Sequence, residues 1–201
     1  MASLNTGDGY GSDFTYKTIL LQSSTFNKSA ELKYVTTDLE VYEHMDKPYL
    51  TATLTIIDTN NILAQTDIRG GESIFISLQS TREDSPIITK TFYITKIITT
   101  QKASASNETH IFHLIEDIAY IANLQNINRS YNGKPETVLS KIADDYLGRS
   151  LQLGNNQSAQ NFKLIIPNLN PIEAMGWIKN SASTIDGYPF YIFSSLVSSI
   201  S

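Results

Sequence analysis

The chain has 201 residues, enough for one large domain or two small ones with a buried core. Fifteen basic and twenty acidic side chains give a net charge of −5, which argues against sequence-independent binding to nucleic acid or anionic lipid. Cysteine is absent, so disulfides, cysteine-bound metals and a thiol nucleophile are excluded, and three histidines leave few other metal or acid–base sites. We therefore expect neither a cofactor nor a metal ion.

The first thirteen residues are polar and include Gly7, Gly9 and Gly11. They lack an apolar period, so residues 1–13 are expected to form a flexible leader. The glycines resemble a phosphate-binding loop only superficially, because no strand precedes them and no helix follows. The chain also lacks the apolar run of a signal peptide and any stretch of about 18 apolar residues. A soluble protein made inside the cell is expected.

Apolar and polar residues alternate from about residue 14 to residue 115, which is typical of half-buried antiparallel strands. The segment from Leu50 to Ile56 shows this most clearly, with threonine at each odd position. The residues expected to share one core are Leu50, Ala52, Leu54, Ile56, Ile74, Ile76, Leu78, Ile88, Phe92, Ile94, Ile98, His110, Phe112 and Leu114. Lys90 and Lys96 interrupt this face. Five or six such strands predict a small antiparallel β-barrel or sandwich, and we favour the barrel.

One predicted strand changes phase within its length. Its apolar residues Leu32 and Tyr34 occupy even positions, whereas Leu39 occupies an odd one. A slip of one residue between Thr36 and Asp38 lets both halves face the same core, which is what a β-bulge does. Because bulges bend strands, this one favours a closed or nearly closed antiparallel barrel over residues 14–115.

After residue 115 the apolar period becomes helical. Residues 135–147 begin with a proline and end before Gly148, which suit the two ends of a helix. The predicted apolar stripe of this helix contains Val138, Leu139, Ile142, Ala143 and Tyr146. A second helix is expected over residues 171–183, with Asn170 as N-cap and Glu173 completing a capping box.

Residues 116–201 are therefore expected to form a smaller α+β domain after the β-barrel domain, so that the whole chain is α+β and β-rich. A turn at Asp186-Gly187 leads into Tyr188–Phe193, which is apolar on both faces and predicts an interior strand. Serine-rich residues follow, and no further element covers the edge of that strand. The second domain is expected to be truncated.

No catalytic template fits the remaining polar residues. His110 and His113 form an H-x-x-H pair, but in a strand they point to opposite faces and cannot share a metal. His44 lies in a charged hairpin end and is interpreted as a solvated loop residue. Asp144 and Asp145 are neighbours on a helix and diverge by about 100°, so they suit a solvated face. We expect no catalytic, cofactor-binding or metal-binding residue, and no enzyme.

The segments that carry a family resemblance are Glu31–Leu39, Tyr49–Asp58, Gly71–Ser77, Phe92–Thr95, His110–Glu116, Glu136–Leu147 and Ile166–Ile178. Their succession resembles the central baseplate hub protein of contractile-tailed, T-even-type bacteriophages. The resemblance covers nearly the whole chain from about residue 13 and rests on pattern and order. The helix from Asn170 to Ile178, followed by Asp186–Tyr191, is its clearest part.

The resemblance implies a structural virion protein rather than an enzyme. Hub proteins of this family are homotrimers of β-barrel domains around a central channel, which join the tail tube to the membrane-piercing spike. Implied partners are other copies of the chain, the spike protein, the tube protein and the baseplate wedge proteins, with no nucleic acid and no membrane. The implied location is the tail baseplate, after assembly in the host bacterial cytoplasm. Related folds form the hub of type VI secretion spikes.

Two other functions remain open from the sequence. A carbohydrate- or receptor-binding β module of a phage tail would need exposed aromatic rings, for which Tyr10, Tyr16, Tyr49 and Tyr131 are the candidates. An unrecognised hydrolase would need carboxylates or histidines that converge on one place. Family members also carry a second barrel beyond this point, so the isolated chain is expected to be monomeric or weakly associated and prone to aggregate at its open strand edge.

Overall fold

The computed structural model describes residues 2–3, 14–23, 28–59, 61–66, 68, 70–81, 85–104, 107–154 and 158–197. The chain divides into two compact units. The first consists of Met1–Tyr42 and Thr51–Asp117, and the second of Glu43–Leu50 and Ile118–Ser201. The second unit is thus built from two stretches of chain that are far apart in sequence.

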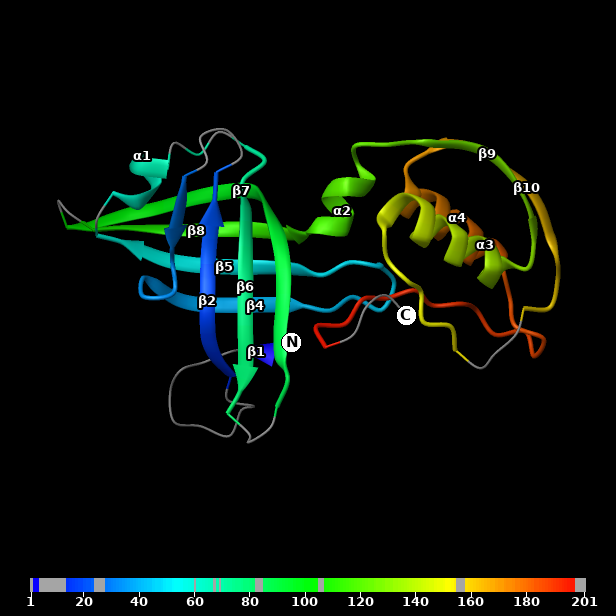
Figure 1. Ribbon diagram of the computed structural model, residues 1–201, viewed down its shortest axis with the longest axis horizontal. Helices are drawn as coiled ribbons and strands as arrows, with labels where there is room; N and C mark the ends of the chain where they lie inside the picture. The colour runs from blue at the N-terminus through cyan, green and yellow to red at the C-terminus, as the bar shows by residue number, and fades with distance from the viewer. Residues whose placement is uncertain are drawn as a thin grey trace. The chain divides into compact units, whose positions relative to one another are not determined.

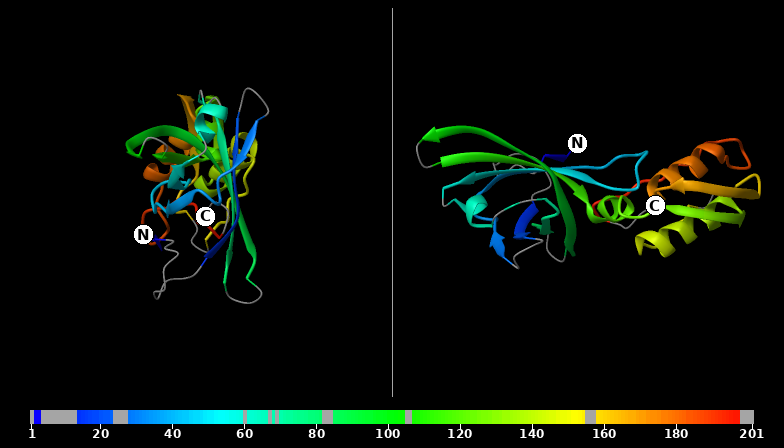
Figure 2. Two further views of the ribbon diagram at one scale, coloured as in Figure 1. Left: turned by 90° about the vertical axis from the view of Figure 1, so that its left-hand side faces the viewer. Right: turned by 90° about the horizontal axis from the view of Figure 1, so that it is seen from above.

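The first unit is one antiparallel sheet that curls into a half-barrel (Figures 1 and 2). Its strands are β1 (Ala2–Ser3), β2 (Phe14–Gln22), β3 (Ser29–Glu31), β4 (Thr36–Tyr42), β5 (Thr51–Asp58), β6 (Ser73–Ser80), β7 (Ile87–Ser104) and β8 (Asn107–Glu116). Their order across the sheet is β1-β4-β5-β8-β7-β6-β2-β3. A short helix, α1 (Ile62–Thr66), lies between β5 and β6 in the chain. The β-rich α+β class is confirmed.

The alternation in the sequence corresponds to the two faces of this sheet. In β5 each even-numbered residue is buried, so Ala52, Leu54 and Ile56 face the interior and the threonines do not. Ile56 and Ile76 are almost fully buried, as predicted. The aromatic rings of Phe92 and Phe112 are buried in the same core.

The predicted bulge is present where the phase changes. The pairing of β4 with β5 shifts register between Thr36 and Asp38, which confirms the expectation from the sequence. Tyr34, however, does not face the core as predicted, because its side chain is 86% exposed. The chain makes a turn before β4, where the N–H of Val35 donates to the carbonyl of Leu32 at 3.0 Å. Tyr34 lies in that turn and points into solvent.

This turn also connects the two margins of the sheet. β3 is at one margin and β4 is next to the other, yet only residues 32–35 separate them in the chain. The N–H of Leu32 donates to the carbonyl of Ile19 in β2 at 2.7 Å. The N–H of Ile57 in β5 donates to the carbonyl of Val35 at 2.9 Å. The turn therefore brings the ends of the sheet together, although β3 and β1 form no ladder within the described residues.

The two lysines that interrupt the predicted core face of β7 lie in different environments. Lys90 is mostly buried and pairs with Glu116. Lys96 is exposed, because the pairing of β7 with β8 shifts register between Ile94 and Lys96. After this bulge Ile97, not Ile98 as predicted, is opposite the buried Phe112. A second bulge thus reverses the faces of β7 as far as Thr100, after which the register shifts again.

The expected leader lies mostly outside the described residues. Ala2 and Ser3 are described, and they form the strand β1 rather than a flexible end. They pair with Val41 and Glu40 of β4. Two residues of backbone pairing therefore extend the sheet at this margin.

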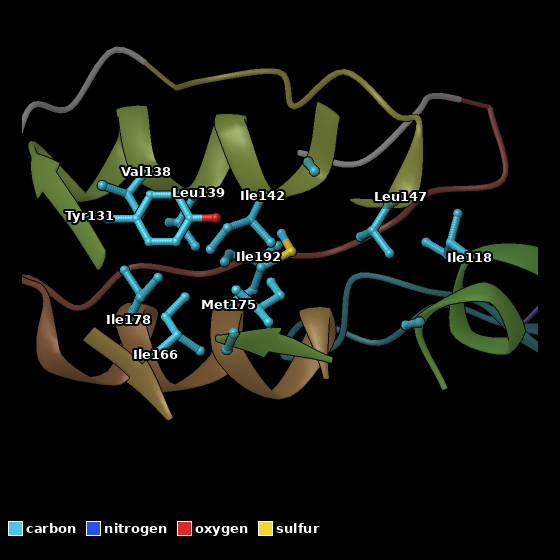
Figure 3. Packing of buried hydrophobic residues seen from close by; sticks show 14 residues of the cluster. Ile118, Tyr131, Val138, Leu139, Ile142, Leu147, Ile166, Met175, Ile178 and Ile192 are labelled. Carbon is cyan, nitrogen blue, oxygen red and sulfur yellow. The ribbon is translucent and has the colours of Figure 1, made fainter. Parts of the chain in front are cut away.

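The second unit combines helices with a two-stranded sheet. Its elements are α2 (Asp117–Ala122, whose first residue belongs to the first unit), β9 (Ile127–Gly133), α3 (Pro135–Ile142), the π-turn η1 (Ala143–Leu147), β10 (Phe162–Leu169) and α4 (Pro171–Ser181). β9 and β10 are antiparallel. Figure 3 shows the core, in which residues of α3 and α4 face each other.

Both predicted helices are present, with one change in each. The first ends in a π-turn rather than continuing as an α-helix, and Gly148 follows in the left-handed conformation with φ 60°. The second begins with the predicted capping box between Asn170 and Glu173. It ends at Ser181 rather than at residue 183, because Ala182 is extended. Among the described residues no helix is both long and apolar enough to cross a bilayer.

The predicted interior strand at Tyr188–Phe193 is wrong. These residues form no strand, and the one bridge in this described stretch is between Pro189 and Ser183. Ile192 is buried, whereas Tyr188, Tyr191 and Phe193 are exposed. The second unit covers only the inner face of this segment, so the aromatic residues on the other face reach solvent.

Candidate interaction surface

The residues with catalytic potential do not converge. In the part of the chain that the structure describes, no three His, Asp or Glu side chains are close enough to hold a metal ion. His110 is buried on the inner face of β8, with its Nε2 3.7 Å from Oε2 of Glu108. His113 is on the other face and half-exposed. The prediction that these two histidines point to opposite faces is confirmed.

The remaining polar candidates are separated in the same way. His44 is half-buried, and its ring centroid lies 6.4 Å from that of Tyr49. Asp144 and Asp145 are both exposed, as predicted for a solvated face. Oδ2 of Asp145 lies 3.5 Å from Nη1 of Arg129 in β9, and both side chains are more than half exposed. Such an exposed pair stabilises a fold only slightly.

The four tyrosines considered for ligand binding do not form an exposed platform. Tyr10 lies outside the described residues. Tyr131 is buried in the core of the second unit, and Tyr16 and Tyr49 are half-buried. Burial raises the pKa of Tyr16, and the nearby carboxylate of Asp38 raises it further. These rings have mainly packing roles.

The exposed aromatic residues lie instead near the end of the described chain. Tyr188, Tyr191 and Phe193 expose 66%, 57% and 38% of their surface, and we call these three residues the aromatic edge. A groove of about 420 Å³ is lined by Tyr191 and Phe193 of this group, with Leu153 and Pro189 in its wall. Single exposed apolar residues are common, but several aromatic residues beside one groove suit an interaction surface.

Three anchors hold the aromatic edge in place. At its start, the N–H of Tyr188 donates to Oγ1 of Thr184 at 3.0 Å, and the N–H of Thr184 donates to the carbonyl of Tyr188 at 2.9 Å. In the middle, Ile192 inserts into the core near Ile142 and Met175 (Figure 3). The edge therefore follows a fixed path.

The third anchor is at the end of the segment. Oε1 of Glu43 accepts hydrogen bonds from Ser195 Oγ at 3.0 Å and from the N–H of Leu196 at 2.7 Å. Glu43 belongs to the connection between β4 and β5, which forms part of the second unit. A single carboxylate thus joins the two sequence-distant parts of this unit.

A half-buried carboxylate lies near the base of the aromatic edge. Ser158 forms an isolated β-bridge with Thr184, and its N–H lies 3.5 Å from Oε1 of Glu136 in α3. Burial raises the pKa of Glu136, but hydrogen bonds from Ser158 and the backbone and the charge of Lys134 outweigh it, so the pKa is lowered. The ionised carboxylate of Glu136 thus accepts from the residue that bridges to Thr184.

The backbone of the aromatic edge is open as well as its side chains. Among the described residues, Tyr191, Ile192 and Phe193 form no backbone hydrogen bond and belong to no helix or strand. The sequence reasoning missed this surface because it treated the apolar run as buried.

A second hollow lies between β10 and α4. It has a volume of about 260 Å³ and is lined by Phe162, Leu164 and Trp177 among others. Trp177, the one tryptophan of the chain, is 43% exposed. Because the hollow is lined from β10, from α4 and from the chain next to β10, all in one unit, it is a surface feature of the second unit.

Comparisons with known proteins give structural likenesses at low identity. No protein-family model matches the sequence, and no curated protein matches it either. A tail protein from Neisseria meningitidis MC58 is 13% identical over 91% of this chain and 49% of its own, with a TM-score of 0.49. The 43 kDa tail protein of prophage MuSo2 from Shewanella oneidensis is 13% identical over 82% of this chain and 48% of its own, with a TM-score of 0.47.

A third solved structure is that of a Francisella PdpA-VgrG complex. It is 15% identical over 78% of this chain and 23% of its own, with a TM-score of 0.39. This chain therefore spans about half the length of the two tail proteins. Those two structures are described as tail proteins.

Proposed function

We propose that this protein is a structural subunit of a contractile phage tail, located in the baseplate hub between the tail tube and the central spike. The proposal is supported by the order of its parts, a curled antiparallel sheet followed by an α+β unit with a capped helix and an Asp186-Gly187 turn. This is the order on which the resemblance to hub proteins rests. The observation that carries it furthest is the aromatic edge, because a fixed, uncharged, exposed surface suits permanent protein contacts.

The proposed assembly is a homotrimer around a channel, with spike, tube and wedge proteins as partners. In this role the protein acts by geometry, since the half-barrel supplies a rigid wall and the second unit presents surfaces to neighbours. The protein is not an enzyme in this proposal, and it needs neither metal nor cofactor. It is assembled in the host cytoplasm and then forms part of the virion.

The two alternative functions receive less support. The four tyrosines considered for carbohydrate or receptor binding give it no exposed platform, because the three described ones are buried or half-buried. Hydrolysis requires convergent carboxylates or histidines, whereas no three His, Asp or Glu side chains gather in the described part of the chain. Both assessments concern the described residues.

The deciding experiment is electron microscopy of the chain purified alone and together with the tube and spike proteins of the same particle. We expect a ternary complex in which this chain occupies the density between tube and spike, with three-fold symmetry. Failure to bind either partner, or density at the tip of a tail fibre, would contradict the hub proposal. Fibre-tip density would favour receptor binding instead.

A further inference from the structure

We propose that copies of this chain bind one another through the outer face of the sheet in the first unit, with Glu40 of one copy against Lys96 of the next. The outer face consists of the side chains of β4, β5, β8 and β7 that point away from the buried core, and these strands are neighbours in the sheet (Figure 1). This contact rests on the proposed function for the number of copies that assemble, and it adds the surface by which they meet. It does not involve the aromatic edge.

One row of side chains crosses this face from an acidic to a basic end. Glu40 of β4 pairs with Thr53 of β5. Thr53 pairs with His113 of β8, and His113 pairs with Lys96 of β7. Because residues directly opposite each other in an antiparallel ladder lie on one face, the four side chains point to the same side. With neighbouring strands about 4.8 Å apart, the two ends of the row are roughly 14 Å apart along the backbone surface.

The charges at the two ends of the row are available for contacts. Lys96 is exposed and, within the described part of the chain, forms no ion pair. Glu40 is partly exposed and accepts a hydrogen bond from the hydroxyl of Tyr42, which leaves its charge in place. Asp38, two residues earlier on the same face of β4, is also partly exposed. The β4 side of the face is therefore acidic, and the β7 side is basic.

This separation of positive and negative charge points to a second copy as the occupant. Between the two ends, β5 contributes only three threonines and Ile57 to the outer face. A surface with one acidic and one basic end is complementary to another copy of itself, whereas a surface of a single sign requires a partner of opposite charge. Copies that meet in this way place a carboxylate against an ammonium group at each contact.

Apolar side chains beside the charged row provide area to bury. The solvent face of an antiparallel sheet is usually polar, yet this face carries two apolar cross-strand pairs, Ile98 with Ile111 and Tyr93 with Ile115. All four side chains are partly exposed, and Ile57 of β5 exposes 38% of its surface. Exposed ion pairs alone stabilise little, so burial of these side chains supplies most of the binding free energy and the charges determine how the copies are oriented.

Sedimentation equilibrium of the full chain tests the contact. We expect self-association at high micromolar concentration. Lys96→Glu and Glu40→Lys are each expected to weaken it by more than about tenfold, because each substitution places like charges together. The two substitutions in one chain exchange the ends of the row, so they are expected to restore association to within about threefold of the unchanged chain.

Three controls separate the contact from general effects of charge. Lys17→Glu on β2 and Asp46→Lys in the connection after β4 make the same changes of net charge at exposed positions outside the row. Both are expected to leave association unchanged. Tyr42→Phe removes the hydroxyl that binds Glu40 without changing a charge, and it should have little effect on association. Circular dichroism and thermal unfolding check that each variant folds.

A mixture of the two single variants tests the pairing directly. Lys96→Glu alone and Glu40→Lys alone each give a row with the same charge at both ends, whereas the two variants together are complementary. An equimolar mixture is therefore expected to associate at least about tenfold more tightly than either variant by itself. Sedimentation velocity with a fluorescent label on one variant measures this association.

Several results would overturn the contact. A chain that is monomeric at every concentration, both unchanged and in the mixture of variants, excludes it. Association that survives Lys96→Glu, or that Lys17→Glu weakens equally, places the interface elsewhere. Loss without recovery in the double variant shows that Lys96 does not bind Glu40 of another copy. The hub proposal fails on a separate result, the absence of tube and spike binding by the unchanged chain, so the two failures are distinguishable.

Discussion

Nζ of Lys90 lies 2.8 Å from Oε1 of Glu116, which joins β7 to the last residue of β8 on the inner side of the sheet. The Glu116 side chain is 3% exposed and that of Lys90 16%. The sequence pattern treats Lys90 as an interruption of the apolar face. It is instead the partner of a carboxylate that the fold places in the core.

Replacing Lys90 by methionine is expected to lower the free energy of unfolding by about 3 kcal/mol, because a buried carboxylate loses its cationic neighbour. The measurement is urea unfolding at pH 7. Lys96→Met on the same strand is the control, since Lys96 is exposed, and its effect is expected to stay within about 0.5 kcal/mol. Equal effects of the two substitutions would mean that the ion pair contributes nothing.

Ile56→Ala and Ile76→Ala are each expected to lower the free energy of unfolding by about 2–5 kcal/mol, through lost apolar burial and the cavity left behind. Both side chains are almost completely buried. Ile57→Ala, next in sequence but 38% exposed, is the matched control and should cost less than 1 kcal/mol by the same principle. A cost below about 1 kcal/mol at Ile56 or Ile76 would contradict the assignment of the core face.

The capping box of α4 gives a third prediction. Asn170 Oδ1 accepts from the N–H of Glu173 at 2.9 Å, and the Glu173 carboxylate accepts from the N–H of Asn170 at 3.3 Å. Asn170→Ala is therefore expected to cost about 1 kcal/mol in thermal unfolding. Asn180→Ala, at the exposed other end of the helix, should cost clearly less.

The raised pKa of Tyr131 predicts that the protein loses stability at alkaline pH. Burial, together with the nearby phenol of Tyr146, raises its pKa from 10.0 to about 12. The unfolded chain releases this proton near pH 10 and the folded chain retains it, so the contribution of Tyr131 is complete below pH 10 and is lost as the pH approaches 12.

Unfolding free energies measured between pH 9 and about 12 check this prediction. Tyr131→Phe should flatten the alkaline decline, because phenylalanine has no proton to lose. The same substitution at Tyr34, which is 86% exposed, should leave the decline unchanged. A decline of equal slope in Tyr131→Phe would assign the effect to other groups.

Glu43→Ala is expected to release the end of the aromatic edge. The carboxylate holds Ser195 and Leu196, so amide hydrogen exchange at residues 194–197 should become at least several-fold faster. Asp46→Ala in the same connection is the control, because Asp46 is exposed. Unchanged exchange in Glu43→Ala would show that Ile192 alone fixes the segment.

The sequence located a β-bulge where the odd or even position of the apolar residues was unambiguous on both sides of it. The slip between Thr36 and Asp38 could be predicted, because the residues on its two sides differ clearly in parity. The bulge after Ile94 could not, since Ile97 and Ile98 are both apolar and either could continue the core face. Alternation locates a bulge only if the residues after it distinguish inside from outside.

The aromatic edge was not predicted, because burial depends on how many layers cover a segment. An apolar run such as Tyr188–Phe193 is typical of a strand covered on both faces, and here the second unit covers one. The usable signal was charge, because no charged side chain occurs from residue 188 to residue 197. An uncharged, aromatic-rich stretch is typical of a contact surface.

The connection at Glu43–Leu50 also determines when the protein can finish folding during its synthesis. Its sheet neighbours β4 and β5 leave the ribosome early, but Glu43 cannot bind Ser195 until the chain has emerged as far as that residue. At the usual rate of roughly 5–20 residues per second, the missing 152 residues take on the order of ten seconds. During that interval Tyr49, which later packs against the second core, is without its contacts. Nascent chains stalled before residue 195 should therefore expose this loop to proteolysis, and released chains should protect it.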